Sequence, residues 1–185
     1  MRVATVSGAE TARARCVRVR RRLLGVARCR YAEDRLADAV SAGTRQLVLF
    51  GSALDTFASH NPYPEVRVHR VAAALPDIAL QAAGFDTRCA TFAVHLGGSV
   101  MALDARLRLL QACSAGAEIV FDIVPEQAGR IDRLLRDSGW SVLEELDASA
   151  LAARYLSDAP DPSDSREPRL VWARVGNNAG RLPNS

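Results

Sequence analysis

Hydrophobic and polar residues follow two spacings along this chain, and these spacings predict its helices and strands. Between residues 28 and 40, apolar side chains recur every three or four positions with charged residues opposite them, and Gly43 follows where a helix would end. This pattern predicts an amphipathic helix. Residues 46–50 are almost wholly apolar and are followed by Gly51, which is typical of a parallel strand that is buried on both faces.

The alternation of helical and extended segments continues to residue 175. Short apolar runs predict strands at 66–68, 91–94, 118–123, 140–143 and 170–175. Helical periodicity predicts helices at 72–83, 103–113, 127–137 and 148–156. Strands that alternate with helices require crossover connections, so we expect an α/β fold with a mainly parallel sheet. The last two strands are joined through a short helix and a polar loop, and we expect an antiparallel edge there.

Composition is consistent with a single folded domain. The chain has 185 residues, 49% of them apolar, which is enough for a core without disulfides or metals. The four cysteines, Cys16, Cys29, Cys89 and Cys113, form no C-x-x-C pair, which argues against a metal site and favours reduced thiols. No apolar run approaches the roughly 18 residues of a membrane helix. We therefore expect a cytoplasmic protein with no membrane contact.

Positive charge is concentrated near the N-terminus. All 24 basic residues are arginine, and eight of them lie between Arg13 and Arg30. We expect residues 1–24 to form a basic arm or helix, 25–176 a Rossmann-like domain and 177–185 a flexible tail. The arm could contact phosphates or an acidic partner protein. It lacks the interleaved aromatic residues of single-strand binders, so a nucleic acid partner is not expected.

The turn after the strand at 46–50 is the first candidate binding site. Ligands of open parallel sheets bind beyond the carboxyl ends of the strands. Gly51 can form the tight turn, the small Ser52 and Ala53 leave room for a ligand, and Asp55 can accept a hydrogen bond. Taken alone, the same residues also fit a simple turn in which Asp55 caps the next helix.

Longer motifs on both sides of this turn resemble a known family. Arg28-Cys29-Arg30-Tyr31-Ala32-Glu33-Asp34 resembles the pattern R-x-R-(F or Y)-A-E-D, and Gly51-Ser52-Ala53-Leu54-Asp55-Thr56 resembles G-A-G-L-D-T. Both patterns are typical of the leucine carboxyl methyltransferase-like family of S-adenosylmethionine-dependent O-methyltransferases. Weaker similarities to later motifs of the same family follow in the family's order as far as Val175. The resemblance implies a class I methyltransferase fold, shortened in the middle.

The resemblance also implies the cofactor S-adenosylmethionine and the residues that bind it. Those residues are Arg28, Gly51, Ser52, Ala53 and Asp55, with the methionine carboxylate of the cofactor near the Arg28 guanidinium. The methyl acceptor would be a small molecule with a carboxyl or hydroxyl group, and His95 would lie on its side of the site. No catalytic side chain is assigned, because the sulfonium of the cofactor supplies the reactivity.

Some residues depart from the family pattern. Ala53 replaces the central glycine of G-A-G, and His69 and Arg70 stand where the family has an acidic residue for the ribose hydroxyls. The segment between Arg70 and residue 83 is too short for one helix and one strand of the family. The alternative function is therefore a catalytically inactive, methyltransferase-like binding or regulatory module. A homo-oligomer stays open, and both His60 and His69 are expected to face solvent.

Overall fold

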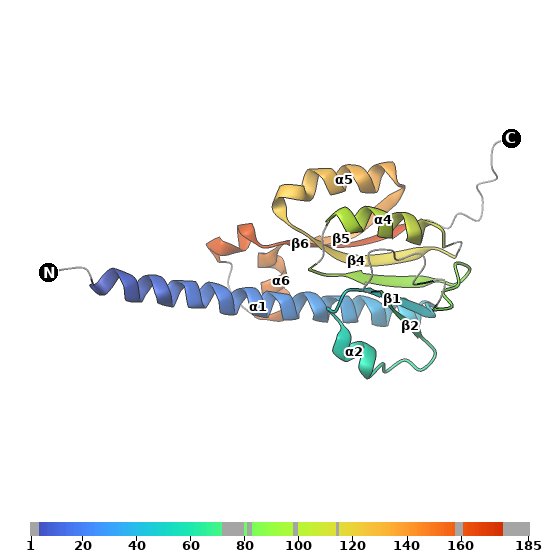
Figure 1. Cartoon of the computed structure of the whole chain (residues 1–185), viewed down its shortest axis with the longest axis horizontal. Helices are drawn as coiled ribbons and strands as arrows, with labels where there is room; N and C mark the ends of the chain where they lie inside the picture. Colours follow the sequence, from blue (N-terminus) through green and yellow to red (C-terminus); the bar gives the residue numbers. More distant parts are fainter. Residues whose placement is uncertain are drawn as a thin grey trace.

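The computed structural model describes residues 4–71, 80, 83–97, 100–113, 115–157 and 161–175. The chain begins with a long helix and then alternates strands with shorter helices (Figure 1). The helices are α1 (Ala4–Ser41), α2 (Asp55–Ser59), α4 (Val100–Gln111), α5 (Ala128–Asp137) and α6 (Ala148–Tyr155). The strands are β1 (Gln46–Phe50), β2 (Arg67–Val71), β3 (Thr91–His95), β4 (Ala117–Ile123), β5 (Trp140–Leu146) and β6 (Arg169–Val175). Two short 3₁₀ helices, η1 (Pro125–Gln127) and η2 (Pro162–Arg166), complete the described elements.

All six strands of the described residues belong to one sheet with the order β2-β1-β3-β4-β6-β5. The strands β2, β1, β3 and β4 are mutually parallel, as the alternation of strands and helices predicts. The last strand, β6, runs antiparallel to both of its neighbours and lies between β4 and β5. The α/β fold with a mainly parallel sheet and an antiparallel C-terminal part is therefore confirmed, with β5 as the outermost strand.

β1 is an interior strand, and its position explains its composition. It pairs with β2 on one side and β3 on the other, and every one of its residues is buried. Val48 and Phe50 pack on the sheet face covered by α4 and α5, whereas Leu47 and Leu49 pack on the face covered by α1 and α6 (Figure 1). A strand with apolar neighbours on both faces needs the continuous apolar run that the sequence contains.

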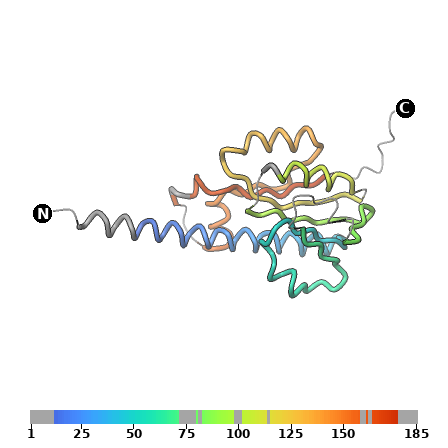
Figure 2. Tube along the Cα trace, viewed as in Figure 1, coloured from blue at the N-terminus to red at the C-terminus, as the bar shows by residue number. Residues whose placement is uncertain are grey.

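α1 is longer than the periodicity from residue 28 predicts, since it begins at Ala4. The blue part of the trace in Figure 2 runs along the sheet and projects beyond it. Its C-terminal half packs against the sheet through buried residues at helical spacing, among them Leu24, Tyr31 and Leu36. Its N-terminal half extends beyond the sheet, beside η2. The helix passes through residue 24 without a break, and the division into an arm and a domain at that position stays a prediction.

Two sequence predictions lie largely or wholly outside the described residues: the helix at 72–83, of which only residues 80 and 83 are described, and the tail at 177–185. Leu80 is buried in the core on the α4 side of the sheet. Among the described helices, none combines the length and hydropathy needed to cross a membrane. The four cysteines are free thiols, and Cys113 is fully buried.

Candidate functional site

The turn after β1 leaves open space at the carboxyl edge of the sheet. Gly51 adopts φ +95°, and a Cβ added at this glycine would meet no atom within 4 Å. The Gly51 amide donates to the carbonyl of Val71 at 3.2 Å, which holds the turn against the end of β2. Gly51 and Ser52 are exposed, whereas Leu54 is buried and anchors the far side of the turn. The positive φ explains why glycine is needed here.

A second glycine turn follows β3 and is tied to β4. Gly97 adopts φ +69°, also with open space where a Cβ would lie. Its amide donates to the Asp122 carboxylate at 2.8 Å. Burial raises the pKa of Asp122 above its ordinary value, while the Gly97 amide and the nearby positive charge of Arg28 oppose that rise. The ends of β1, β3 and β4 therefore carry two open turns and one partly desolvated carboxylate.

Replacement of Asp122 by asparagine is expected to stabilise the protein at neutral pH. Asparagine keeps an acceptor for the Gly97 amide but removes the charge that burial disfavours. The native pKa lies above the unfolded value of about 3.9, so wild-type stability rises as the pH falls through this window. Thermal unfolding should show a Tm gain of about 2 °C at pH 7 that shrinks toward pH 4. A loss of Tm at pH 7 would contradict this assignment.

α1 brings a guanidinium and a thiol to the same edge. Arg28 is only 7% exposed, and one of its terminal nitrogens donates to Glu167 at 3.5 Å. Its Nε atom is buried and has no hydrogen-bond partner in the part of the chain that the structure describes. The neighbouring Cys29 thiol donates to the carbonyl of Ala53 at 3.3 Å, which ties α1 to the turn after β1. Burial, reinforced by the charge of Glu33, raises the pKa of Cys29 and keeps it a thiol.

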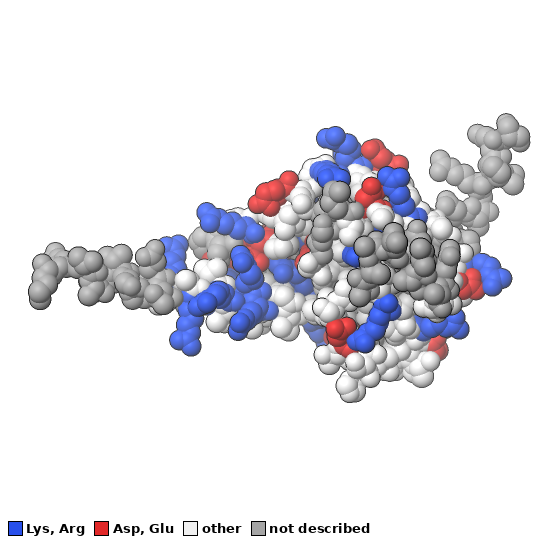
Figure 3. Space-filling model, viewed as in Figure 1, with Lys and Arg blue, Asp and Glu red and all other residues white. Residues whose placement is uncertain are grey.

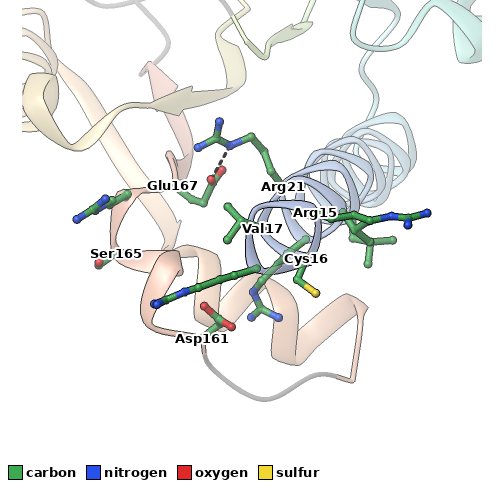
Figure 4. Close-up of a pocket in the computed structure, with 12 residues that line it drawn as sticks. Arg15, Cys16, Val17, Arg21, Asp161, Ser165 and Glu167 are labelled. Atoms are coloured by element: carbon green, nitrogen blue, oxygen red, sulfur yellow. Dashed lines mark hydrogen bonds and ion pairs between the residues drawn. The ribbon is translucent and has the colours of Figure 1, made fainter. Parts of the chain in front are cut away.

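Glu167 is a neighbour of Arg28 that sequence reasoning missed. Its buried carboxylate accepts from Arg21 at 2.8 Å as well as from Arg28, so two arginines of α1 share one carboxylate. It also lines a cavity of about 1010 Å³ between α1 and η2 (Figure 4). Glu167 lies in a polar loop that matches no motif, so the sequence did not indicate it as a residue of the site. Gly97, by contrast, follows a predicted strand and could have been selected.

At the end of β2, the side chains pair with one another or are buried. The Arg70 guanidinium donates to the carboxylate of Asp55 at 2.9 Å and to the backbone carbonyl of Asp55 at 3.0 Å.

The prediction that His69 faces solvent is wrong: the His69 side chain is 2% exposed and packs edge-on against the Phe85 ring. Alternate residues of a strand face opposite sides, and position 69 shares the core side with Val71. Burial, aided by the charge of Arg67, lowers the pKa of His69. His60 is exposed, as predicted.

His95 lies on the opposite face of the sheet from Arg28. Its ring is 1% exposed, lies edge-on to Phe50, and accepts a hydrogen bond from Arg106 of α4. The Arg106 guanidinium stacks over the Phe50 ring at 4.7 Å, and burial lowers its pKa. Of the residues predicted to bind the cofactor, Arg28 and Ala53 are brought together through Cys29, and Gly51, Ser52 and Asp55 lie around the same turn.

His95 lies apart from them, in the core. The predicted role of His95 beside a substrate stays a prediction.

Within the described part of the chain, no group of three or more histidine, cysteine, aspartate or glutamate residues is placed to hold a metal ion. The groups described at this edge of the sheet include the Arg28 guanidinium, the Asp122 carboxylate and the exposed backbone of the turn after β1. Such groups bind a zwitterionic or anionic organic molecule by charge and hydrogen bonding.

Three solved structures are similar to this chain at low identity. The [4+2]-cyclase SpnF is 15% identical, with 77% of this chain and 81% of that chain covered at a TM-score of 0.39. A putative sarcosine dimethylglycine methyltransferase from Galdieria sulphuraria is 11% identical, with 79% and 83% covered at 0.37. A protein-(glutamine-N5) methyltransferase from Alicyclobacillus acidocaldarius is 18% identical, with 72% and 80% covered at 0.34. At these TM-scores the likeness carries no argument about function.

No curated protein sequence matches the chain significantly. A family model does match: residues 4–72 fit the family described as leucine carboxyl methyltransferase. The match contains α1, β1, the glycine turn and β2, and it extends one residue beyond the end of β2. It includes both motifs on which the resemblance was based. The predicted resemblance of this chain to the leucine carboxyl methyltransferase family is therefore confirmed over residues 4–72.

Proposed function

We propose that this chain is an S-adenosylmethionine-dependent methyltransferase that transfers a methyl group to a carboxyl or hydroxyl oxygen of a small molecule. One observation carries the proposal. The glycine turns after β1 and β3 are open, and beside them lies the buried Arg28 guanidinium. Among the described residues it has one long hydrogen bond, to Glu167, and its Nε atom has no partner. A buried donor without a partner is unfavourable, and a ligand carboxylate would satisfy it.

The residues fit the amino acid end of the cofactor. Arg28 provides a positive charge and a free donor for a carboxylate, while the Asp122 carboxylate, partly desolvated, is suited to attract an ammonium group. Gly51 and Gly97 have no Cβ to fill the space beside their backbone, so a ligand can approach both turns closely. This end of the site supports binding by charge and by shape.

The residues fit the ribose end less well. A pair of ribose hydroxyls is best held by a free carboxylate at the end of the second strand. The residues at this position provide no such carboxylate: Arg70 is basic and pairs with Asp55, and the neighbouring His69 is buried against Phe85. This arrangement is what favours the second candidate, an inactive binding module. On the proposal, S-adenosylmethionine binds mainly through its methionine portion and therefore weakly.

The bound cofactor would supply an electrophilic methyl group on its sulfonium. The side chains of the chain would bind and orient: Arg28 holds the carboxylate, and the two glycine turns set the position of the cofactor along the edge of the sheet. Alignment of the acceptor oxygen with the methyl group then accounts for catalysis, and no protein nucleophile is required. The small-molecule acceptor follows from the family resemblance rather than from a contact in the structure.

A change of Ala53 to glycine is expected to strengthen cofactor binding about threefold, because it removes a Cβ from the turn at the position where the family has glycine. Isothermal titration with S-adenosylmethionine and with S-adenosylhomocysteine measures this directly. Ala58→Gly in α2 is the matched control, because it introduces the same flexibility five residues further along and should leave the affinity unchanged. A wild-type protein that binds neither compound at millimolar concentration would favour the inactive module.

A further inference from the structure

The middle of α1 presents an apolar ridge to solvent. Val19, Leu23 and Val26 are 50%, 44% and 65% exposed, and they lie four and three residues apart. This spacing puts the three side chains on one stripe of the helix. The opposite side of the same helix turns toward the protein, where Leu24 is fully buried and Arg20 pairs with Asp164. The ridge is therefore an exposed apolar face on an anchored helix, and Val19 and Leu23 also line the cavity between α1 and η2.

Arginines without partners flank this ridge. Arg15, Arg18 and Arg22 are exposed, and among the described residues none of them forms an ion pair or a hydrogen bond. The chain has no aspartate or glutamate between residues 11 and 32 that could neutralise them. Basic side chains gather on the described part of α1 that projects from the body of the molecule (Figure 3). We define the outward α1 face as Arg15, Arg18, Val19, Arg22, Leu23 and Val26.

We propose that the outward α1 face is a docking surface for an acidic amphipathic helix of a partner protein. The ridge offers the i, i+4, i+7 pattern against which the apolar stripe of a second helix packs. Carboxylates flanking that stripe would neutralise the three free guanidinium groups, and complementary charge of this kind fixes the orientation of a bound helix. The occupant is thus defined by two matching features, an apolar stripe and negative charge beside it.

Other occupants match only part of this face. A second copy of the chain would bring the same arginines against these arginines, and like charges repel at an interface. An anionic membrane would match the charge, but helices that lie on membranes carry larger apolar residues such as Trp, Phe and Leu, and Leu23 alone on the ridge is of this kind. Duplex DNA would match the charge and leave the apolar ridge without a counterpart.

The test uses the full chain and a designed peptide. The peptide is a helix with leucines at i, i+4 and i+7 flanked by glutamates, and its fluorescence anisotropy reports binding. The comparison peptide has the same composition in scrambled order. We expect the designed peptide to bind at least about tenfold more tightly than the scrambled one, and its affinity to fall as salt is raised.

Variants assign the binding to the outward α1 face. The triple variant Arg15→Glu, Arg18→Glu, Arg22→Glu is expected to weaken peptide binding about tenfold, and Leu23→Ser to weaken it severalfold. The charge-matched control is Arg130→Glu, Arg133→Glu, Arg136→Glu on α5, where the three arginines are also exposed, and it should change the affinity less than about twofold. Circular dichroism verifies that each variant keeps its helix content.

The proposal is overturned by any of three results. These are equal binding of the designed and scrambled peptides, equal loss in the α1 and α5 triple variants, or tighter binding of anionic phosphatidylglycerol vesicles or duplex DNA than of the designed peptide. None of these measurements depends on the cofactor, so the outcome is independent of whether the chain binds S-adenosylmethionine.

Discussion

Replacement of Arg28 by alanine is expected to weaken S-adenosylmethionine binding by about 10- to 100-fold, as isothermal titration would measure it. The guanidinium is buried beside the open turns and retains an unpartnered donor. A hydrogen bond to a charged group contributes about 1.5–3 kcal/mol, which corresponds to this range of affinity. The loss should be the same for S-adenosylhomocysteine, because both compounds carry the same carboxylate.

Two further variants separate this role of Arg28 from its contact with Glu167. Arg21→Ala removes the other arginine that holds Glu167 but leaves Arg28 in place, so it should reduce the affinity far less. Glu167→Gln removes the internal carboxylate that competes for Arg28, and it should leave the affinity equal or higher. Equal losses in Arg28→Ala and Arg21→Ala would show that both arginines act on the fold rather than on the ligand.

Replacement of Asp164 by alanine is expected to reduce the free energy of unfolding by about 3 kcal/mol. The buried carboxylate accepts from two nitrogens of Arg20 at 2.7 and 2.8 Å, from the Ser149 hydroxyl and from the Asp161 amide. Its removal takes these two hydrogen bonds and a nearby negative charge from the Arg20 guanidinium, whose side chain is only 13% exposed. Loss of one partner from a buried pair is far more destabilising than loss of an exposed pair. Denaturation by urea measures the difference.

The control is Asp104→Ala in α4, where the carboxylate pairs with Arg108 across one helical turn at the surface and should contribute less than about 0.5 kcal/mol. The stabilisation by Asp164 also depends on pH. The hydrogen bonds from Arg20 hold the pKa of Asp164 below its ordinary value. Its stabilisation is therefore complete above the unfolded pKa of about 3.9, and is lost as the pH falls through the native pKa. Equal losses in the two variants at neutral pH would refute this role for Asp164.

Much of the fold could be predicted from local pattern. The run at 46–50 is apolar at every position except Gln46, because β1 lies between two strands and two layers of helices, and such burial leaves a clear trace in the sequence. The end of α1 could also be predicted, since Gly43 follows it with φ +107°. The start of α1 could not, because none of the side chains at positions 12–23 is buried, so no buried stripe imposes a period on that part of the sequence.

The candidate site could be predicted only where it depends on backbone turns and motifs. Gly51 and Arg28 belong to motifs and were selected. Glu167 contacts Arg28 across 139 positions of sequence, and this contact depends on the placement of β6 between β4 and β5 rather than on local pattern. His69 was misjudged because β2 continues to Val71, so that position 69 becomes a core position of a strand.

The most direct test of the central claim is the response of two amides to the cofactor product. In ¹H–¹⁵N correlation spectra, glycine amides occupy a separate region. The signals of Gly51 and Gly97 can be assigned by elimination, by replacing the other glycines one at a time and identifying the signal that each replacement removes. Titration with S-adenosylhomocysteine is expected to shift the Gly51 and Gly97 amides together, along one saturating curve, while the amide of Gly139 at the start of β5 stays in place. Constant Gly51 and Gly97 positions up to millimolar ligand would contradict the assignment of a cofactor site to these turns.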